Sequence, residues 1–347
     1  MTQQEIAALA GQVLCTAVGH PRTVGVEPGA PIPPEVFDAN VDDVVADIER
    51  HGVAGVCWFP SRPEGDPPDR VAEVVDRLQR AAAVPLLVAT DQEGGRVARM
   101  RDGFFVAPSA RSYAGDAAAV RRDAERTARE LRTVGLNAVF APDADVDSNP
   151  DNPVIADRSY SADPDVVVDC VTAALDGFAA GGVAGCVKHF PGHGDTAVDS
   201  HVGLPVIGRS RVDWEALEAV PFRAAVGAGV PMVMTGHLVL PEFDALPASF
   251  SHRLLTGVLR QQWGFDGVVV SDSLQMAGAR QGRSDAEVVV DALAAGVDLL
   301  LLPPSVGGAV DALVAAVTSG RITEERLREA AGRVRRLKAR LGLVSAD

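Results

Sequence analysis

Strand-length runs of apolar residues recur along this chain, and each is followed by a polar loop and then by a helical pattern. The runs are Gln12–Val18, Gly55–Phe59, Pro85–Thr90, Ala138–Ala141, Ala184–Val187, Met232–Thr235, Gly267–Val270 and Val297–Leu302. Continuous apolar strands are typical of parallel sheets that helices cover on both faces. The pattern therefore predicts an α/β fold, a (β/α)8 TIM barrel that occupies residues 1–347 as a single domain. A doubly wound parallel sheet is the structural alternative.

Helical patterns lie between these runs, with apolar residues at helical spacing. They cover Val41–His51, Val71–Ala82, Ala117–Val134, Pro164–Ala180, Trp214–Gly227, Leu254–Trp263, Asp285–Ala295 and Val310–Ser319, and a final helix covers about 324–341. Three long loops, 21–34, 60–70 and 143–164, are rich in Pro, Gly and Asp. No linker with a shift in composition divides the chain, which favours one domain.

Ionisable residues follow four of the apolar runs. Asp91 follows the third run, Lys188 and His189 the fifth, His237 the sixth and Asp272 the seventh. The active site of a barrel lies at the carboxyl ends of its strands. We therefore expect these side chains to share one cleft.

The segment from Lys188 to His201 holds three of the chain's 7 histidines and one of its two lysines. A loop rich in Gly and Pro that follows a buried strand and carries such groups is typical of an active site. His189, His193, Asp199 and His201 do not follow the spacing of a helical zinc motif, and Lys188 would compete with a cation. We therefore predict no metal.

The net charge of −15 argues against nucleic acid and anionic membranes as partners. Scattered cysteines without metal-like spacing predict buried free thiols. The sequence shows neither a signal-peptide pattern nor an apolar run of membrane-spanning length, so we expect a cytoplasmic protein. A small neutral or polar substrate fits this composition.

Four motifs, in order along nearly the whole chain, resemble glycoside hydrolase family 3. They are Asp91-Gln-Glu-Gly-Gly-Arg-Val-Ala-Arg99, Lys188-His-Phe-Pro-Gly-His-Gly-Asp-Thr196, Asp199-Ser-His201 and Ser271-Asp-Ser-Leu-Gln-Met276. Asp157-Arg158-Ser159 also matches a substrate-binding stretch of that family. Within the family, the sequence is most similar to the bacterial single-domain β-N-acetylglucosaminidases of the NagZ type.

This resemblance implies a (β/α)8 barrel and a retaining mechanism through a covalent glycosyl-enzyme. It implies Asp272 as the nucleophile, His201 as the acid/base and Asp199 as the partner of His201. The residues implied to hold the hydroxyls of a terminal N-acetylglucosamine (GlcNAc) are Asp91, Arg99, Arg158, Lys188 and His189. Ser273 departs from the family, where many members carry a second Asp. No cofactor is implied.

The chemistry of the residues agrees with these roles. An imidazole titrates near neutrality without help, so His201 suits proton transfer, and Asp199 lies close enough in sequence to fix its tautomer. His193, Asp195 and Glu93 are expected to organise the structure around the site, and His237 is a candidate for the pocket floor.

The resemblance implies peptidoglycan fragments that carry a terminal GlcNAc as substrates, and we expect the protein to be a monomer. Three alternatives remain open: a β-glucosidase, a phosphorylase of GlcNAc glycosides, and a non-catalytic sugar-binding protein. A His acid/base would not repel an incoming phosphate, which keeps the phosphorylase in consideration.

Overall fold

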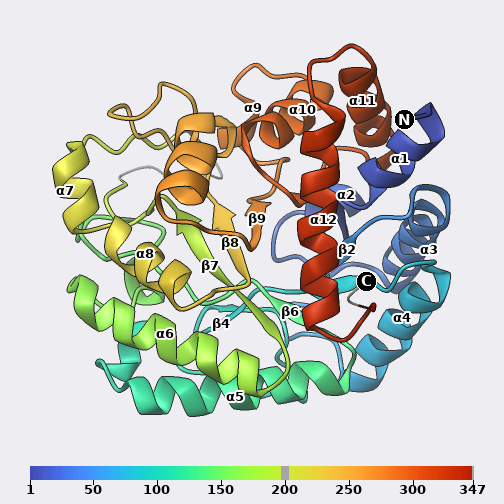
Figure 1. The fold of residues 1–347 in the computed structure, drawn as a ribbon. Helices are drawn as coiled ribbons and strands as arrows, with labels where there is room; N and C mark the ends of the chain where they lie inside the picture. Colours follow the sequence, from blue (N-terminus) through green and yellow to red (C-terminus); the bar gives the residue numbers. More distant parts are fainter. Residues whose placement is uncertain (197–202, 346–347) are drawn as a thin grey trace.

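The computed structural model describes residues 1–196 and 203–345, and parallel strands surrounded by helices form its centre (Figure 1). The strands of this barrel are β1 Leu14–Val18, β2 Gly55–Trp58, β3 Leu87–Ala89, β6 Ala138–Val139, β7 Ala184–Phe190, β8 Met232–Thr235, β9 Val268–Ser271 and β10 Leu300–Leu301. All their pairings are parallel, in the orders β10-β1-β2-β3 and β6-β7-β8-β9. Each strand begins within three residues of its predicted apolar run.

Hydrogen bonds at two seams join these two groups of strands into a closed ring. Between β3 and β6, Asn137 N–H donates to the carbonyl of Val88 at 3.0 Å and Phe140 N–H to that of Thr90 at 2.9 Å. Between β9 and β10, Val270 and Leu299 form a parallel bridge. The prediction of a (β/α)8 barrel is therefore confirmed, and the doubly wound sheet, which would be open, is excluded.

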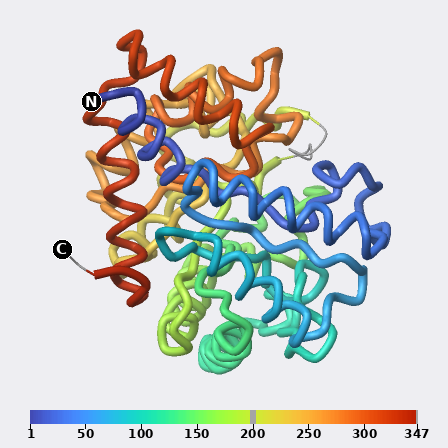
Figure 2. The backbone as a smooth tube through the Cα atoms, turned by 90° about the vertical axis from the view of Figure 1, so that its right-hand side faces the viewer, coloured from blue at the N-terminus to red at the C-terminus, as the bar shows by residue number. Residues whose placement is uncertain are grey.

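Helices form the outer ring, as Figures 1 and 2 show. They are α1 Gln3–Gly11, α2 Pro21–Val24, α3 Pro34–His51, α4 Pro68–Ala81, α5 Ala117–Thr133, α6 Pro164–Ala180, α7 Arg211–Ala216, α8 Ala219–Gly227, the π-type helix η4 Arg253–Gln262, α9 Ala277–Arg280, α10 Asp285–Ala295, α11 Val306–Thr318 and α12 Glu324–Arg340. The short 3-10 turns are η1 Ala110–Tyr113, η2 Ala156–Arg158 and η3 Ala248–Phe250, and β4 Gln92–Gly94 pairs with β5 Val97–Ala98 as a hairpin.

The prediction of one helix over Trp214–Gly227 is wrong, because the chain breaks at Leu217 into α7 and α8. Pro221 explains the break. In a continuous helix Pro221 would lie in the interior, where it lacks an N–H and its ring clashes with the carbonyl of residue 217. In α8 it lies in the first turn, where no intrahelical N–H is needed.

Helix α12 packs against one end of the barrel. Val334 and Leu337 on its inner face belong to the same apolar cluster as Cys15 and Leu87 inside the barrel. Figure 2 shows α12 along one side of the molecule and α2, which follows β1, on the opposite side. Helix α12 therefore covers the amino-terminal end of the barrel, and the carboxyl-terminal end of the barrel strands remains open for a site.

The four cysteines, Cys15, Cys57, Cys170 and Cys186, are buried free thiols, as predicted. Among the described residues, no helix combines the length and the apolar character needed to cross a membrane.

Candidate active site

A cavity of about 520 Å³ lies at the carboxyl ends of the strands. Six of the predicted site residues line it, namely Asp91, Arg99, Arg158, Lys188, His189 and Asp272. They come from segments spread over most of the chain, so the shared cleft that the strand ends predict is present. Asp199 and His201, the predicted proton-transfer pair, lie outside the described residues.

Strand β7 continues to Phe190, whereas the sequence predicted its end at Val187. Lys188 and His189 therefore lie within the strand, and they do not begin the loop after it. The strand continues because Asp143 pairs with Lys188 on one side and Thr235 pairs with Phe190 on the other. Both side chains therefore lie near the end of a central barrel strand, where its register with β8 shifts between Val187 and Phe190.

The glycines of the following loop are required for close packing. A Cβ on Gly194 would lie 1.6 Å from the carbonyl oxygen of Val146, and Gly192 has φ 120° beside the side chain of Glu218. Close packing alone therefore explains why both positions are glycine, without a mobile loop. His193 N–H donates to Asp145 at 2.6 Å and Thr196 Oγ1 lies 2.6 Å from His193 Nδ1, so His193 organises the loop, as predicted.

Lys188 is the centre of a buried ion network. Its Nζ lies 2.8 Å from Asp91 Oδ1 and 2.6 Å from Glu93 Oε1. Burial would lower the pKa of Lys188, but the two carboxylates raise it above its ordinary value. Burial would likewise raise the pKa of Asp91, but Lys188 and Arg99 hold it below its ordinary value. Lys188 is therefore a fixed cation and Asp91 a fixed anion.

Arg158 joins the same network from η2. Its guanidinium donates to both oxygens of Glu93, at 2.8 and 2.9 Å, and approaches Asp143 Oδ2 at 3.3 Å. Although burial opposes it, Arg158 and Lys188 hold the pKa of Glu93 well below its usual range. Glu93 is thus a shared anion between two cations. Such a bidentate arrangement fixes the guanidinium plane.

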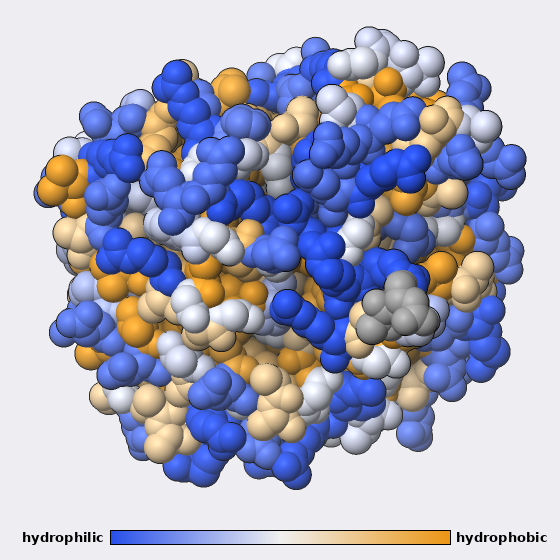
Figure 3. All heavy atoms as spheres, in the orientation of Figure 1, coloured by the Kyte–Doolittle hydropathy of each residue, from blue (hydrophilic) through white to orange (hydrophobic). Residues whose placement is uncertain are grey.

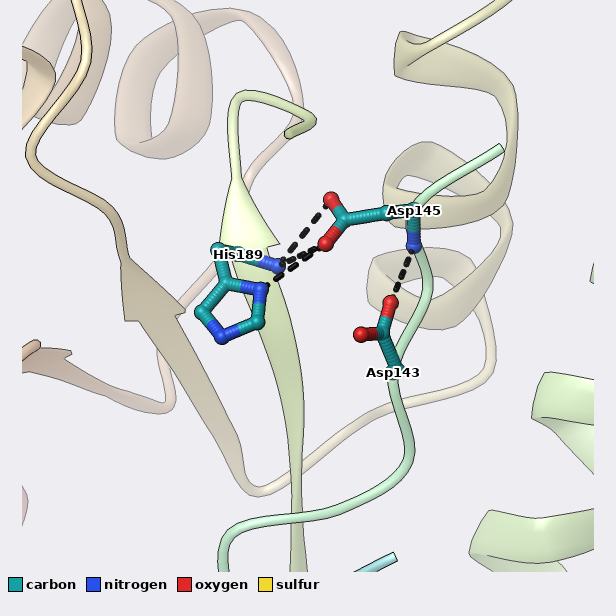
Figure 4. Close-up of side chains that lie close together, drawn as sticks. All are labelled: Asp143, Asp145 and His189. Carbon is teal, nitrogen blue, oxygen red and sulfur yellow. Dashed lines mark hydrogen bonds and ion pairs between the residues drawn. The ribbon is translucent and has the colours of Figure 1, made fainter. Parts of the chain in front are cut away.

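Asp145, the second acidic side chain after β6, holds His189 in place. His189 Nδ1 lies 2.8 Å from Asp145 Oδ2, and the backbone N–H of His189 also donates to this carboxylate (Figure 4). The other ring nitrogen, Nε2, lies 3.3 Å from an Arg158 nitrogen that can only donate. Nε2 is therefore the acceptor and Nδ1 carries the proton. Burial, with the charge of Arg158, lowers the pKa of His189 to about 4, so its ring is neutral near pH 7.

Asp143 is the neutral member of a carboxyl pair. Burial raises its pKa well above the ordinary value, and the neighbouring charge of Asp145 raises it further. Its Oδ1 accepts the backbone N–H of Asp145 at 2.9 Å (Figure 4). Two buried carboxyls this close cannot both ionise readily, so the pair carries one negative charge.

The same three side chains, Asp143, Asp145 and His189, could present ligand atoms to a metal within 4.8 Å of one another. The contacts do not favour an ion there. Nδ1 of His189 faces Asp145, and Nε2 together with Asp143 Oδ2 faces Arg158, whose charge would oppose a cation. We interpret the group as a hydrogen-bonded support for His189.

Asp272 lies directly after β9, at the cavity wall. Its backbone N–H donates to the carbonyl of Thr235 at 2.9 Å, and its Oδ1 accepts the N–H of Ser273 at 2.7 Å. His237 is not among the cavity-lining residues, so the hypothesis that it forms the pocket floor is wrong. Buried behind the site, its Nε2 donates to the carbonyl of Ser273 at 3.0 Å and its Nδ1 pairs with Ser249 at 2.7 Å. His237 thereby fixes the backbone beside Asp272.

Sequence reasoning missed the pair Asp143 and Asp145, because residues 143–164 read as a long polar loop. A signal was present, since both follow the apolar run Ala138–Ala141 and so satisfy the same strand-end rule as Asp91. It also underrated Glu93, which lines the cavity and binds two predicted sugar-binding side chains.

Comparison with known proteins places this site in a family. The family model described as the glycosyl hydrolase family 3 N-terminal domain matches residues 23–337. The chain belongs to glycoside hydrolase family 3. The resemblance inferred from the four motifs is therefore confirmed.

Several known proteins are similar over most of the chain. It is 43% identical to a β-hexosaminidase of Thiobacillus denitrificans over 72% of this chain and 71% of that protein. It is 33% identical to β-hexosaminidase A of Pseudoalteromonas piscicida over 91% of this chain, but spans only 57% of that relative. The solved β-N-acetylglucosaminidase of Paenibacillus sp. FPU-7 superposes with a TM-score of 0.87 at 38% identity, over 98% of this chain and 64% of that one.

Proposed function

We propose that the chain is an exo-acting, retaining β-N-acetylglucosaminidase that removes terminal β-linked GlcNAc through a covalent glycosyl-enzyme on Asp272. One observation carries the proposal. A carboxylate at the end of β9 lines the same cavity as a preassembled set of buried donors and acceptors, including Lys188, Asp91 and Arg158. Retaining glycosidases need such a carboxylate beside the sugar to meet the oxocarbenium-like transition state. Similarity to two β-hexosaminidases and a β-N-acetylglucosaminidase supports the same assignment.

The first chemical step forms one bond and breaks one. The Asp272 carboxylate bonds to the anomeric carbon while the bond from that carbon to the leaving oxygen breaks. We propose that protonated His201 donates a proton to the leaving oxygen and becomes neutral, with Asp199 fixing its tautomer and stabilising its imidazolium form. In the second step neutral His201 takes a proton from water, which attacks the anomeric carbon and releases Asp272.

The paired ions supply the sugar recognition that we propose. Asp91 can accept from a sugar hydroxyl, while Lys188, Arg158 and Arg99 can donate to one. His189 lines the same cavity, and in the tautomer that Asp145 fixes its Nε2 accepts from Arg158 and so orients that donor. Because these groups are held by one another before substrate arrives, little ordering remains to be done on binding.

The cavity favours a single terminal sugar over a long internal chain. At about 520 Å³ it has the size of a small-ligand site, which typically spans roughly 300 to 1,000 Å³. We propose peptidoglycan fragments with a terminal GlcNAc as natural substrates, by resemblance to family 3 enzymes of this type. We propose a monomer that uses no metal or cofactor.

Aryl β-glycosides of GlcNAc and of glucose, each assayed with and without phosphate, test the activity. The proposal expects release of the aryl group from the GlcNAc compound, with retention at the anomeric carbon and no need for phosphate. Formation of GlcNAc 1-phosphate only when phosphate is present would instead establish a phosphorylase. Preference for the glucoside would establish a β-glucosidase, and no turnover of either would contradict an enzyme.

A further inference from the structure

A second cavity, of about 700 Å³, lies at the opposite end of the barrel from Asp272. Gln12, Gly52 and Val84 on its wall precede β1, β2 and β3, so it is at the amino-terminal end of these strands. Helices α1, α11 and α12 and the end of α3 supply the rest of its lining. Figure 1 shows α12 crossing this face beside α1, and Figure 3 shows that hydrophilic residues dominate the face, between smaller apolar patches.

Basic side chains are concentrated around this cavity, although the chain as a whole carries a net charge of −15. The basic residues of its lining are Arg50, His51, Arg328, Arg335 and Lys338, and none of the described residues that line it is acidic. Arg50 and Arg328 form no ion pair with any residue that the structure describes. Glu5 and Asp47 lie near these arginines in the structure, but neither makes an ion pair with them.

Lys338 is the most informative member of this lining. It is 1% exposed, and its Nζ has no hydrogen-bond partner among the described residues. The contrast with Lys188, the chain's other lysine, is direct, since Lys188 is buried against two carboxylates. A buried charge without a partner is strongly destabilising, so the side chain is explained poorly by stability alone.

No neighbouring group in the described part of the chain supplies the missing negative charge. Cys15 acts on Lys338 electrostatically, but burial raises the pKa of its thiol to about 12, so the thiol is neutral near pH 7. Burial lowers the pKa of Lys338 to about 8, which still leaves most of the amine protonated at pH 7. Within residues 1–196 and 203–345 the folded protein therefore retains a buried cation at this cavity without a counter-ion.

We propose that this cavity binds a small organic anion whose phosphate or carboxylate group meets Lys338 and Arg50. The rest of the ligand is apolar, because Ala7, Leu9 and Val310 form much of the remaining wall. Its volume lies in the range typical of small-molecule sites, roughly 300 to 1,000 Å³. This site is separate from the proposed sugar cavity and does not depend on the proposed activity.

Calorimetric titration of the full chain with phenyl phosphate tests the site. We expect saturable binding, and we expect Lys338→Met and Arg50→Met each to weaken it roughly ten-fold or more, as for loss of a charged hydrogen bond. Arg122→Met, on exposed α5 and away from both cavities, is the matched control and should bind as the wild type does. Inorganic phosphate lacks the apolar ring and phenol lacks the phosphate group, so each should bind more weakly than phenyl phosphate.

A stability measurement separates ligand binding from a structural role. Methionine has a similar length without the charge, so Lys338→Met should unfold at the same temperature as the wild type or higher, and should lose the rise in melting temperature that phenyl phosphate gives. Equal affinity of wild type and Lys338→Met would overturn the proposal. So would a lower melting temperature of that variant without ligand, since it would reveal a structural partner for the amine.

Discussion

Glu93→Gln is the sharpest test of the ion network beneath the proposed sugar site. Glu93 is 6% exposed and faces Lys188 at 2.6 Å and Arg158 at 2.8 Å, whose side chains are 3% and 11% exposed. Lys188 would keep Asp91 as a charged partner, but Arg158 would keep only two neutral ones, Asp143 and His189. Removing one partner of a buried ion pair typically costs about 3 to 5 kcal/mol. Because glutamine keeps the volume and one acceptor, we expect a loss near the lower end, about 3 kcal/mol.

Urea unfolding at pH 7 measures this loss, and Glu125→Gln is its matched control. Glu125 also faces two arginines, Arg121 and Arg129, but on the surface of α5, where exposed pairs contribute about 0 to 1 kcal/mol. Without Glu93, the side chains of Lys188 and Arg158 should also shift from their positions beside the sugar. We therefore expect kcat/KM for the GlcNAc glycoside to fall by at least about ten-fold, as for loss of a charged hydrogen bond. Equal losses of stability in the two variants would refute the argument.

The same substitution has a predicted pH dependence. The pKa of Glu93 is held below its ordinary value of 4.5, so the unfolded chain takes up a proton first as the pH falls. The stabilisation by Glu93 is therefore fully present above pH 4.5 and declines below it. We expect the stability difference between wild type and Glu93→Gln to shrink in acid. A difference that stays constant from pH 7 to pH 3 would contradict the assigned charge.

Three further substitutions test individual roles. Asp272→Ala should lower kcat by roughly 10⁴-fold or more, as for loss of a catalytic carboxylate, and a near-normal rate would remove it as nucleophile. His201→Ala should slow substrates with poor leaving groups far more than activated aryl glycosides, which need less protonation, and equal losses would count against the acid role. Asp145→Asn should remove the carboxylate that fixes the tautomer of His189 and lower kcat/KM roughly 10- to 100-fold, although Asp272 is intact. An unchanged rate and pH–rate profile would show that Asp145 contributes packing alone.

The barrel could be predicted from the sequence because its strands are continuous apolar runs, and the strand-end rule correctly gathered Asp91, Lys188, His189 and Asp272. The strand-end rule could not predict which charged side chains pair with one another. Glu93 and Lys188 are 95 positions apart along the chain, and no periodicity relates them. His237 failed for a related reason, since a strand end places a residue at the correct edge but does not decide whether its side chain faces the cavity or packs behind it.

Charge balance in the site explains why so many ions surround a neutral sugar. Three cations, Lys188, Arg158 and Arg99, lie among two anions, Asp91 and Glu93, and the carboxyl pair, which carries a single charge. These charges offset one another, so the charge of the proposed nucleophile is left uncompensated within the set. A positive charge that develops on the sugar ring in the transition state would be stabilised by this net negative site, whereas the neutral sugar of the ground state would gain little from it. This balance requires that Asp143 is protonated. A second negative charge at Asp143 would draw Arg158 away from Glu93. It would thereby displace a donor that we assign to the substrate.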